Sequence, residues 1–107
     1  MIYEYRVYHV MPGRMPDINA RFANHTMKLF EKHGIRVVGF WQTVIGDSDE
    51  LTYLCQFDDL AHRTRAWETF QSDPDWIKAR AESEKNGPLV ARFTNTILSP
   101  TPYSPLQ

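Results

Sequence analysis

Apolar side chains follow two different periods along this chain. In four segments they alternate with a period of two, which is typical of β-strands because successive strand side chains point to opposite faces. Between these segments they recur every three or four residues, which places them on one face of an α-helix. The alternating segments predict strands at residues 2–10, 35–45, 51–57 and 89–98.

The first predicted helix runs from Pro16 to His33 and stops at Gly34. Proline is tolerated in the first turn of a helix, and glycine is favoured just after the last turn. An apolar stripe marks the face expected to be buried, and it consists of Ile18, Phe22, Leu29 and Phe30. The polar residues of this helix are expected to be largely solvated: Arg21, Asn24, Lys28, Glu31 and Lys32.

The segment 51–76 joins a strand, a helix and the start of a further helix. Asp58 and Asp59 follow the strand and predict an N-cap, because a side-chain oxygen there can accept from the free N–H groups of the first turn. Asp73 and Pro74 predict the start of a short helix that ends before Gly87. The helix between these caps has an arginine within its apolar face, which is formed by Leu60, Arg63, Trp67 and Phe70.

The first strand carries polar and aromatic groups on both of its faces. Neither set is simply polar, so a central position in the sheet is predicted. Glu4, Arg6 and Tyr8 share one face, and they must find partners inside the molecule or at an interface. Which face of this strand meets the helices stays open from the sequence.

The order strand, helix, strand, strand, helix, strand predicts an α+β fold of the ferredoxin-like, split βαβ type. In it a four-stranded antiparallel sheet, with the first and third strands in the middle, carries its helices on one face. The other face has too many apolar groups to be left in water, so two copies are expected to pair their sheets into a dimeric α/β barrel. We expect one domain over residues 1–107, with a core at 1–98 and a proline-rich, extended tail at 99–107.

The overall charge and the cysteine content exclude several classes of protein. Twelve basic and thirteen acidic residues leave a formal charge of −1, with no basic run that would favour nucleic-acid binding. No apolar run is long enough for a membrane span, and the predicted first strand leaves no room for a signal peptide. The single cysteine, Cys55, lies within a strand and is expected to be a buried, inert thiol in a reducing compartment, which favours the cytoplasm.

A set of short motifs in a fixed order resembles the NIPSNAP family. The set begins with the pattern E-x-R-x-Y at 4–8 and continues with Pro12-Gly13, Gly39, Trp41, Gly46, Arg63, Trp67, Asp73-Pro74-Asp75-Trp76 and the closing stretch 95–106. The resemblance implies a dimeric α/β-barrel fold shared with small monooxygenases, muconolactone-isomerase-like proteins and haem-degrading enzymes, in a family without a settled catalytic activity. The chain departs from the family at 47–49, which lacks an asparagine often found there, and at Tyr53, where many members have a histidine.

The candidate ligand-binding residues are Glu4, Arg6, Tyr8, Arg63 and Trp67. In a functional interpretation Arg63 or Arg6 anchors a ligand carboxylate or enolate, Tyr8 donates a hydrogen bond, and Glu4 acts as a base or an orienting group. In the structural interpretation, which we favour, the same residues form a buried ion-pair network that fixes the strand and dimer register. The tryptophans Trp41, Trp67 and Trp76, together with the tyrosines, either line an aromatic ligand pocket or form core.

Three functions follow from these alternatives. The first is a homodimeric binding or interaction protein that holds a small hydrophobic or aromatic ligand, or none, without turnover. The second is a cofactor-independent monooxygenase or isomerase with Tyr8, His9 and Arg63 as catalytic candidates, and the third is haem binding through His9. The other histidines, His25, His33 and His62, are expected at the surface. No phosphate loop, nucleophile motif or metal-ligand spacing is present, so no cofactor or metal is predicted.

Overall fold

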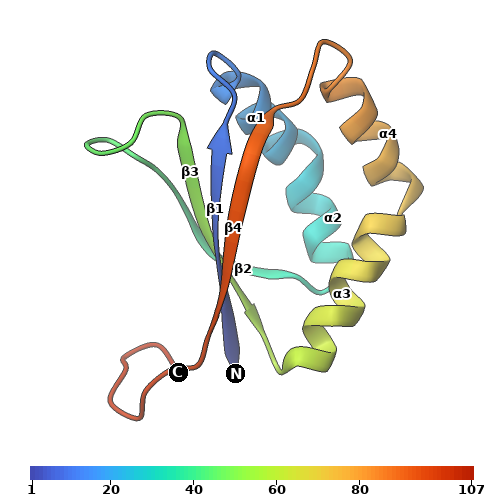
Figure 1. Cartoon of the computed structure of the whole chain (residues 1–107). Helices are drawn as coiled ribbons and strands as arrows, with labels where there is room; N and C mark the ends of the chain where they lie inside the picture. The colour runs from blue at the N-terminus through green and yellow to red at the C-terminus, as the bar shows by residue number, and fades with distance from the viewer.

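The computed structural model describes residues 1–107 as a four-stranded sheet with helices packed on one side of it (Figure 1). The strands are β1 (Ile2–Val10), β2 (Arg36–Gln42), β3 (Glu50–Phe57) and β4 (Val90–Leu98). Their order in the sheet is β2-β3-β1-β4, and every neighbouring pair is antiparallel. The predicted ferredoxin-like fold, with the first and third strands in the centre, is confirmed.

Two groups of helices cover one face of the sheet. The first consists of α1 (Met15–Arg21), a π-helical turn η1 (Phe22–Thr26) and α2 (Met27–Lys32), and the second of α3 (Leu60–Ser72) and α4 (Pro74–Ser83). The predicted caps are confirmed, since the side chain of Asp59 accepts from the backbone N–H of His62 and that of Asp73 accepts from the backbone N–H of Asp75. No helix is long and apolar enough to cross a membrane.

The structure settles which face of β1 meets the helices. Glu4 of β1 bonds to residues of α3, so the even-numbered residues of this strand face the helical layer. The odd-numbered residues, including Tyr5 and His9, face the opposite side of the sheet, which we call the open face. In β3 the buried positions are the odd ones, and they complete the core from the sheet side: Leu51, Tyr53, Cys55 and Phe57.

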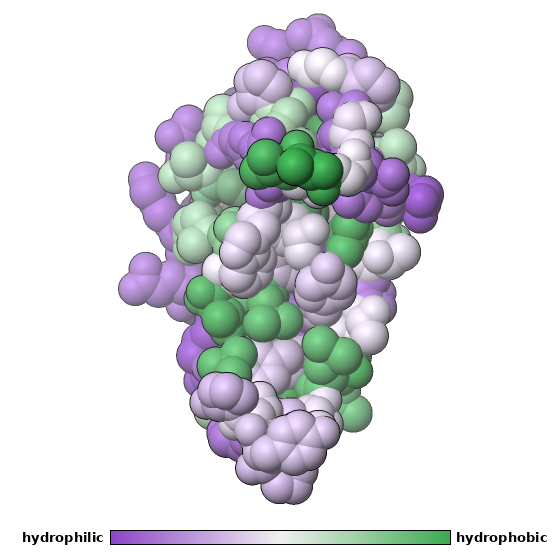
Figure 2. Space-filling view, turned by 90° about the vertical axis from the view of Figure 1, so that its left-hand side faces the viewer, coloured by the Kyte–Doolittle hydropathy of each residue, from purple (hydrophilic) through white to green (hydrophobic).

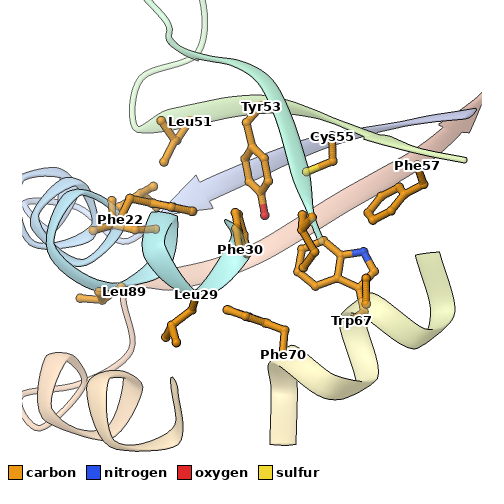
Figure 3. Close-up of a cluster of buried hydrophobic side chains, with 14 residues drawn as sticks. Phe22, Leu29, Phe30, Leu51, Tyr53, Cys55, Phe57, Trp67, Phe70 and Leu89 are labelled. Carbon is orange, nitrogen blue, oxygen red and sulfur yellow. The ribbon is translucent and has the colours of Figure 1, made fainter. Parts of the chain in front are cut away.

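The core between sheet and helices is rich in aromatic side chains, which pack among aliphatic ones (Figure 3). The ring of Tyr53 extends from β3 towards the helices, and its centroid lies 4.8 Å from that of Phe40 and 5.6 Å from that of Phe22. The thiol of Cys55 is fully buried here. Its burial, and to a smaller extent the negative charge of Glu4, raise the pKa of this thiol to about 12. The expectation of an inert thiol is therefore confirmed.

The first group of helices differs from the uniform helix predicted over residues 16–33. In η1 the backbone N–H of Met27 donates to the carbonyl oxygen of Phe22, five residues earlier, so this turn contains an extra residue. Arg21 and Thr26, five residues apart, both become buried. The expectation that Arg21 is solvated was wrong, because this side chain packs against α4, where it contacts Ser83 and Trp76. In α3, Leu60 of the predicted apolar face is exposed.

The predicted second strand and the tail also need correction. β2 contains the expected irregularity at Gly39, where the register with β3 shifts, but it ends at Gln42. Val44 and Ile45 beyond it are almost fully exposed, in the loop that leads to β3. The tail 99–107 is not fully extended: the backbone N–H of Ser104 donates to the carbonyl oxygen of Thr101, which closes a turn. The chain then returns to the sheet, where the Tyr3 hydroxyl donates to the carbonyl oxygen of Gln107.

Candidate functional site

The centre of the site is the carboxylate of Glu4, which is fully buried between β1 and α3. Its Oε1 accepts from Nε of Arg63 and from Nε1 of Trp67, each at 2.8 Å. Its Oε2 accepts from Nη1 of Arg6 at 2.8 Å, from Nη2 of Arg63 at 3.0 Å and from Nδ2 of Asn95 at 3.0 Å. All the hydrogen-bonding capacity of the carboxylate is therefore used within the protein.

These donors keep Glu4 ionised despite its burial. Burial alone raises the pKa of a carboxyl group, because it disfavours the charged form. The hydrogen bonds from Arg63, Asn95 and Trp67, together with the charge of Arg6, outweigh this effect and lower the pKa of Glu4 from 4.5 to about 2. A carboxylate in this state is a poor proton acceptor at neutral pH, so Glu4 is suited to orienting its neighbours rather than to general base catalysis.

Arg6 sits within a cage of aromatic rings. Its guanidinium carbon lies 4.6 Å from the ring centroid of Trp67 and 4.8 Å from that of Phe93, distances at which a cation is attracted to the ring face. The Arg6 side chain spans the network: Nη1 contacts Glu4, and Nη2 makes a long contact of 3.5 Å with the hydroxyl of Tyr8. The Nε atom of Arg6 is buried and has no hydrogen-bond partner.

The network continues through a pair of tyrosines. The hydroxyl oxygens of Tyr8 and Tyr53 lie 2.7 Å apart, and the two rings meet edge to face. Burial, with the negative charge that Tyr8 would carry, raises the pKa of Tyr53 well above its ordinary value. Tyr53 therefore stays protonated and serves as a buried hydrogen-bonding partner for Tyr8.

A groove of about 1040 Å³ runs beside this network, between β4 and the helices α3 and α4. It exists because the helices do not cover β4: Phe93, on the helix side of that strand, is 52% exposed. Trp67 and Phe70 from α3 and Trp76 from α4 line the groove opposite β4. The groove is also lined by three arginines, Arg6, Arg21 and Arg80. Aromatic surface and positive charge therefore meet in one place.

The predicted site residues divide into three groups. Arg6, Tyr8 and Trp67 line the groove directly. Glu4 and Arg63 lie behind them and hold Arg6 and Trp67 in position. His9 belongs to neither group, because it lies on the open face of β1, with Nδ1 3.8 Å from Oε1 of Glu50. The enzyme hypothesis required Tyr8 and His9 to contact the same substrate. Their side chains lie on opposite faces of the sheet, so they cannot both contact a molecule in the groove.

Among the residues that line the groove, Trp76 was predicted as a pocket aromatic, whereas Arg21 and Phe93 were missed. Trp41, which was predicted together with Trp67 and Trp76, lies on the open face instead. Phe93 had been assigned to an edge strand without an indication that helices leave it uncovered. The burial of Arg21 depends on its contacts with α4, a helix that is distant in the sequence.

The remaining histidines have structural roles or lie at the surface. Nε2 of His33 lies 2.7 Å from Oδ2 of Asp73, and it joins α2 to the start of α4. Nε2 of His62 lies 3.0 Å from the carbonyl oxygen of Gly34, whereas His25 is exposed. His33 and His62 are partly exposed, as expected. No group of three or more His, Cys, Asp or Glu side chains is arranged to hold a metal ion.

Comparisons with known proteins agree on the fold and the family. An uncharacterised NIPSNAP-like domain protein from Burkholderia xenovorans is 26% identical, with a TM-score of 0.86 over 97% of this chain and 88% of that one. A NIPSNAP family protein of unknown function from Agrobacterium tumefaciens is 24% identical, with a TM-score of 0.88 over 100% of this chain and 94% of that one.

A more distant structure is that of a proposed antibiotic biosynthesis monooxygenase from Nitrosomonas europaea, which is 7% identical, with a TM-score of 0.65 over 94% of this chain and 98% of that one. This likeness concerns the fold alone. No curated protein matches the sequence. The family model described as NIPSNAP matches residues 3–105, nearly the whole chain, and the protein therefore belongs to the NIPSNAP family.

Proposed function

We propose that this protein is a homodimeric binding protein that holds a small hydrophobic or aromatic molecule in the groove between β4 and the helices α3 and α4, without turnover. The observation that carries the proposal is the aromatic lining of that groove, from Trp67, Phe70, Trp76 and Phe93. Ligand sites are typically concave, of about 300–1000 Å³, and lined mainly by apolar and aromatic side chains with a few fixed polar groups.

The rigidity of the groove wall supports a binding role. Trp67 is fixed by its hydrogen bond to Glu4, and its ring contacts Phe70 edge to face at 5.7 Å between centroids. Phe70 in turn lies 4.7 Å from Trp76, again between centroids. A preformed wall loses little conformational entropy when a flat molecule packs against it, which favours affinity.

The proposed homodimer rests on the open face of the sheet (Figure 2). In this view the middle of the face is mainly green, white and pale purple, whereas the strongly hydrophilic residues gather at its margins. Trp41 is 54% and Tyr5 41% exposed on this face, large rings that are normally covered. Four strands about 4.8 Å apart and about 30 Å long cover roughly 600 Å² in plan, comparable to the ~800 Å² per partner buried in stable interfaces.

The enzymatic alternative, a cofactor-independent monooxygenase or isomerase, is less well supported. The groove is open along β4, so a substrate would not be enclosed and protected from water. Of the three catalytic candidates only Tyr8 lines the groove, while Arg63 is engaged with Glu4 and His9 lies on the other face. For the same reason His9 is not available as an axial haem ligand in the groove.

We place the protein in the cytoplasm. Its single cysteine, Cys55, is buried and unpaired, as is typical of proteins in a reducing compartment.

Two experiments test the proposed function. Crystals soaked with a mixed set of neutral and acidic aromatic compounds should show a molecule against Trp67 and Trp76. Sedimentation velocity at micromolar concentration should give twice the mass of the 12.5 kDa chain. An empty groove after soaks at millimolar concentration would refute the binding role, and a monomer would refute the dimer.

A further inference from the structure

We propose that the groove selects an anionic amphiphile, meaning a small aromatic or aliphatic acid whose negatively charged group is held by Arg6 and Arg21 while its apolar body packs on Trp67, Trp76 and Phe93. This inference rests on the proposed binding function and specifies the class of ligand. A neutral molecule of the same shape should bind more weakly.

The buried network beside the groove has an uncompensated positive charge. The one carboxylate of Glu4 pairs with two guanidinium groups, those of Arg6 and Arg63, each at 2.8 Å. Arg63 makes two hydrogen bonds to the carboxylate, whereas Arg6 makes one. Arg6 is also the member of the pair that lines the groove, although it is only 8% exposed. A buried charge without full compensation favours the binding of an opposite charge beside it.

Arg21 places a second buried cation in the same groove. It is 7% exposed, and its guanidinium carbon lies 5.1 Å from the ring centroid of Trp76. Its Nη1 donates to the hydroxyl of Ser83 at 3.2 Å and lies 3.8 Å from Oε1 of Glu84. The Glu84 carboxylate is shared, because its Oε2 accepts from Arg80 at 3.2 Å. One carboxylate therefore faces two arginines here as well.

Unsatisfied hydrogen bonds point to the same two arginines. In the whole chain only two buried side-chain nitrogen or oxygen atoms lack a partner, and they are Nε of Arg6 and Nε of Arg21. Buried donors are nearly always paired in folded proteins, so each unpaired one requires an explanation. Both belong to side chains that line the groove. Two guanidinium groups with unpaired N–H donors beside one groove favour the binding of a carboxylate or a similar anion.

The charge of the groove contrasts with that of the chain. Arg6, Arg21 and Arg80 line it together with a single acidic residue, Glu84. The chain as a whole carries a formal charge of −1. Positive charge is therefore concentrated in this groove, and a cleft lined by one sign of charge raises the local concentration of oppositely charged ligands.

The apolar lining argues for an acid with a sizeable hydrophobic body rather than for free phosphate or a sugar phosphate. Trp67, Trp76 and Phe93 present flat rings, and their stacking requires a flat or apolar partner. No glycine-rich loop offers a row of backbone N–H groups to a phosphate. An aromatic carboxylate satisfies both the arginines and the rings.

The experiment compares 2-naphthoate with 2-naphthamide, two molecules of nearly the same shape that differ in charge. The probe is the set of three indole N–H signals of the ¹⁵N-labelled protein, assigned with a Trp41→Phe variant. Trp67 and Trp76 line the groove, whereas Trp41 lies on the open face and serves as an internal control. Naphthoate should shift the Trp67 and Trp76 signals saturably, with at least about tenfold tighter binding than the amide, as expected for one hydrogen-bonded charge.

The variant that tests the anchor is Arg21→Met, which removes a groove-lining charge but keeps an apolar stem. It should abolish most of the preference for naphthoate over naphthamide. The matched control is Arg65→Met, which makes the same substitution at an exposed position of α3 that does not line the groove, and it should keep the preference. If Arg21→Met does not fold, the comparison of the two probes on the unmodified protein still decides the charge selection.

The outcomes separate this inference from the proposed function. Equal binding of the two probes, with shifts at Trp67 and Trp76, would overturn anion selection and leave the binding function standing. Absence of any shift for both probes at millimolar concentration would overturn both. Retention of the full naphthoate preference in Arg21→Met would overturn the role of Arg21 as an anchor.

Discussion

Arg63 on α3 holds the carboxylate of Glu4 on β1 through two hydrogen bonds, from Nε at 2.8 Å and from Nη2 at 3.0 Å. The two residues are 59 positions apart in the chain. This paired contact fixes α3 over the central strand, and the bond from Trp67 to the same carboxylate fixes the adjacent turn of the helix. The position of the groove wall is therefore set by one buried carboxylate.

Removal of the negative charge at residue 4 should be strongly destabilising. In Glu4→Gln the guanidinium groups of Arg6 and Arg63 lose their shared counter-charge in a buried position. Breaking a buried ion pair in this way costs about 3 kcal/mol or more. The free energy of unfolding, measured by urea titration with far-UV circular dichroism, should fall by about that amount. Glu82→Gln, at an exposed position of α4, should change it by less than about 0.5 kcal/mol. A comparable, small effect of both substitutions would contradict this assignment.

The same carboxylate makes stability depend on pH in a defined window. The folded-state pKa of Glu4 is lowered from 4.5 to about 2. The stabilisation by the ionised form is therefore complete above pH 4.5 and is lost as the pH falls towards 2. The loss amounts to about 3 kcal/mol for a shift of this size. Hydrogen bonds from Lys32 and then from His33 also lower the pKa of Asp73, which adds to the loss in the same direction.

A comparison of the two proteins isolates the part that belongs to Glu4. Urea unfolding at pH 5, 4 and 3 should show a steeper decline for the unmodified protein than for Glu4→Gln, which keeps Asp73 but has no titrating group at residue 4. Parallel declines in the two proteins would show that Glu4 does not titrate in this window.

Much of the fold was predictable because its signals are local. The caps at Asp59 and Asp73 and the helix end at Gly34 depend on side chains or backbone angles within a few residues, and the structure has them as predicted. The end of β2 was not predictable from its apolar content. Val44 and Ile45 continue the apolar run in the sequence. The pairing of β2 with β3 ends before them, at the hydrogen bond from the backbone N–H of Thr43 to the carbonyl oxygen of Glu50.

The candidate site was predictable only in part, and the reason is the range of the interactions. Glu4, Arg6 and Tyr8 share a strand face by simple alternation, and an arginine in the apolar stripe of a helix requires a buried partner. The groove depends instead on how far α3 and α4 extend over β4, which no local pattern encodes. Arg21, buried against α4, and Phe93, left uncovered at the sheet edge, therefore emerged only from the structure.

The tyrosine pair should respond asymmetrically to removal of its hydroxyl groups. Tyr8→Phe leaves the hydroxyl of Tyr53 buried without a partner, which costs about 1–3 kcal/mol. Tyr53→Phe leaves the hydroxyl of Tyr8 in contact with Arg6 and partly accessible, so a loss of about 1 kcal/mol or less is expected. The double variant should be less destabilised than the sum of the two single ones. Urea unfolding of the four proteins gives this cycle, and additive losses would show that the hydroxyl groups do not interact.

The proposed dimer predicts that a charge at the centre of the open face dissociates the protein. Tyr5 lies on the central strand β1, between β3 and β4, and in Tyr5→Glu two like charges would approach each other across the two-fold axis. Sedimentation velocity should then show a monomer of about half the original mass, with unchanged far-UV circular dichroism. Thr64→Glu, which adds the same charge at an exposed position of α3 on the helical side, should remain a dimer. A dimer that persists in Tyr5→Glu would require a different interface, since a sheet-to-sheet contact has no room for two unpaired carboxylates at its centre.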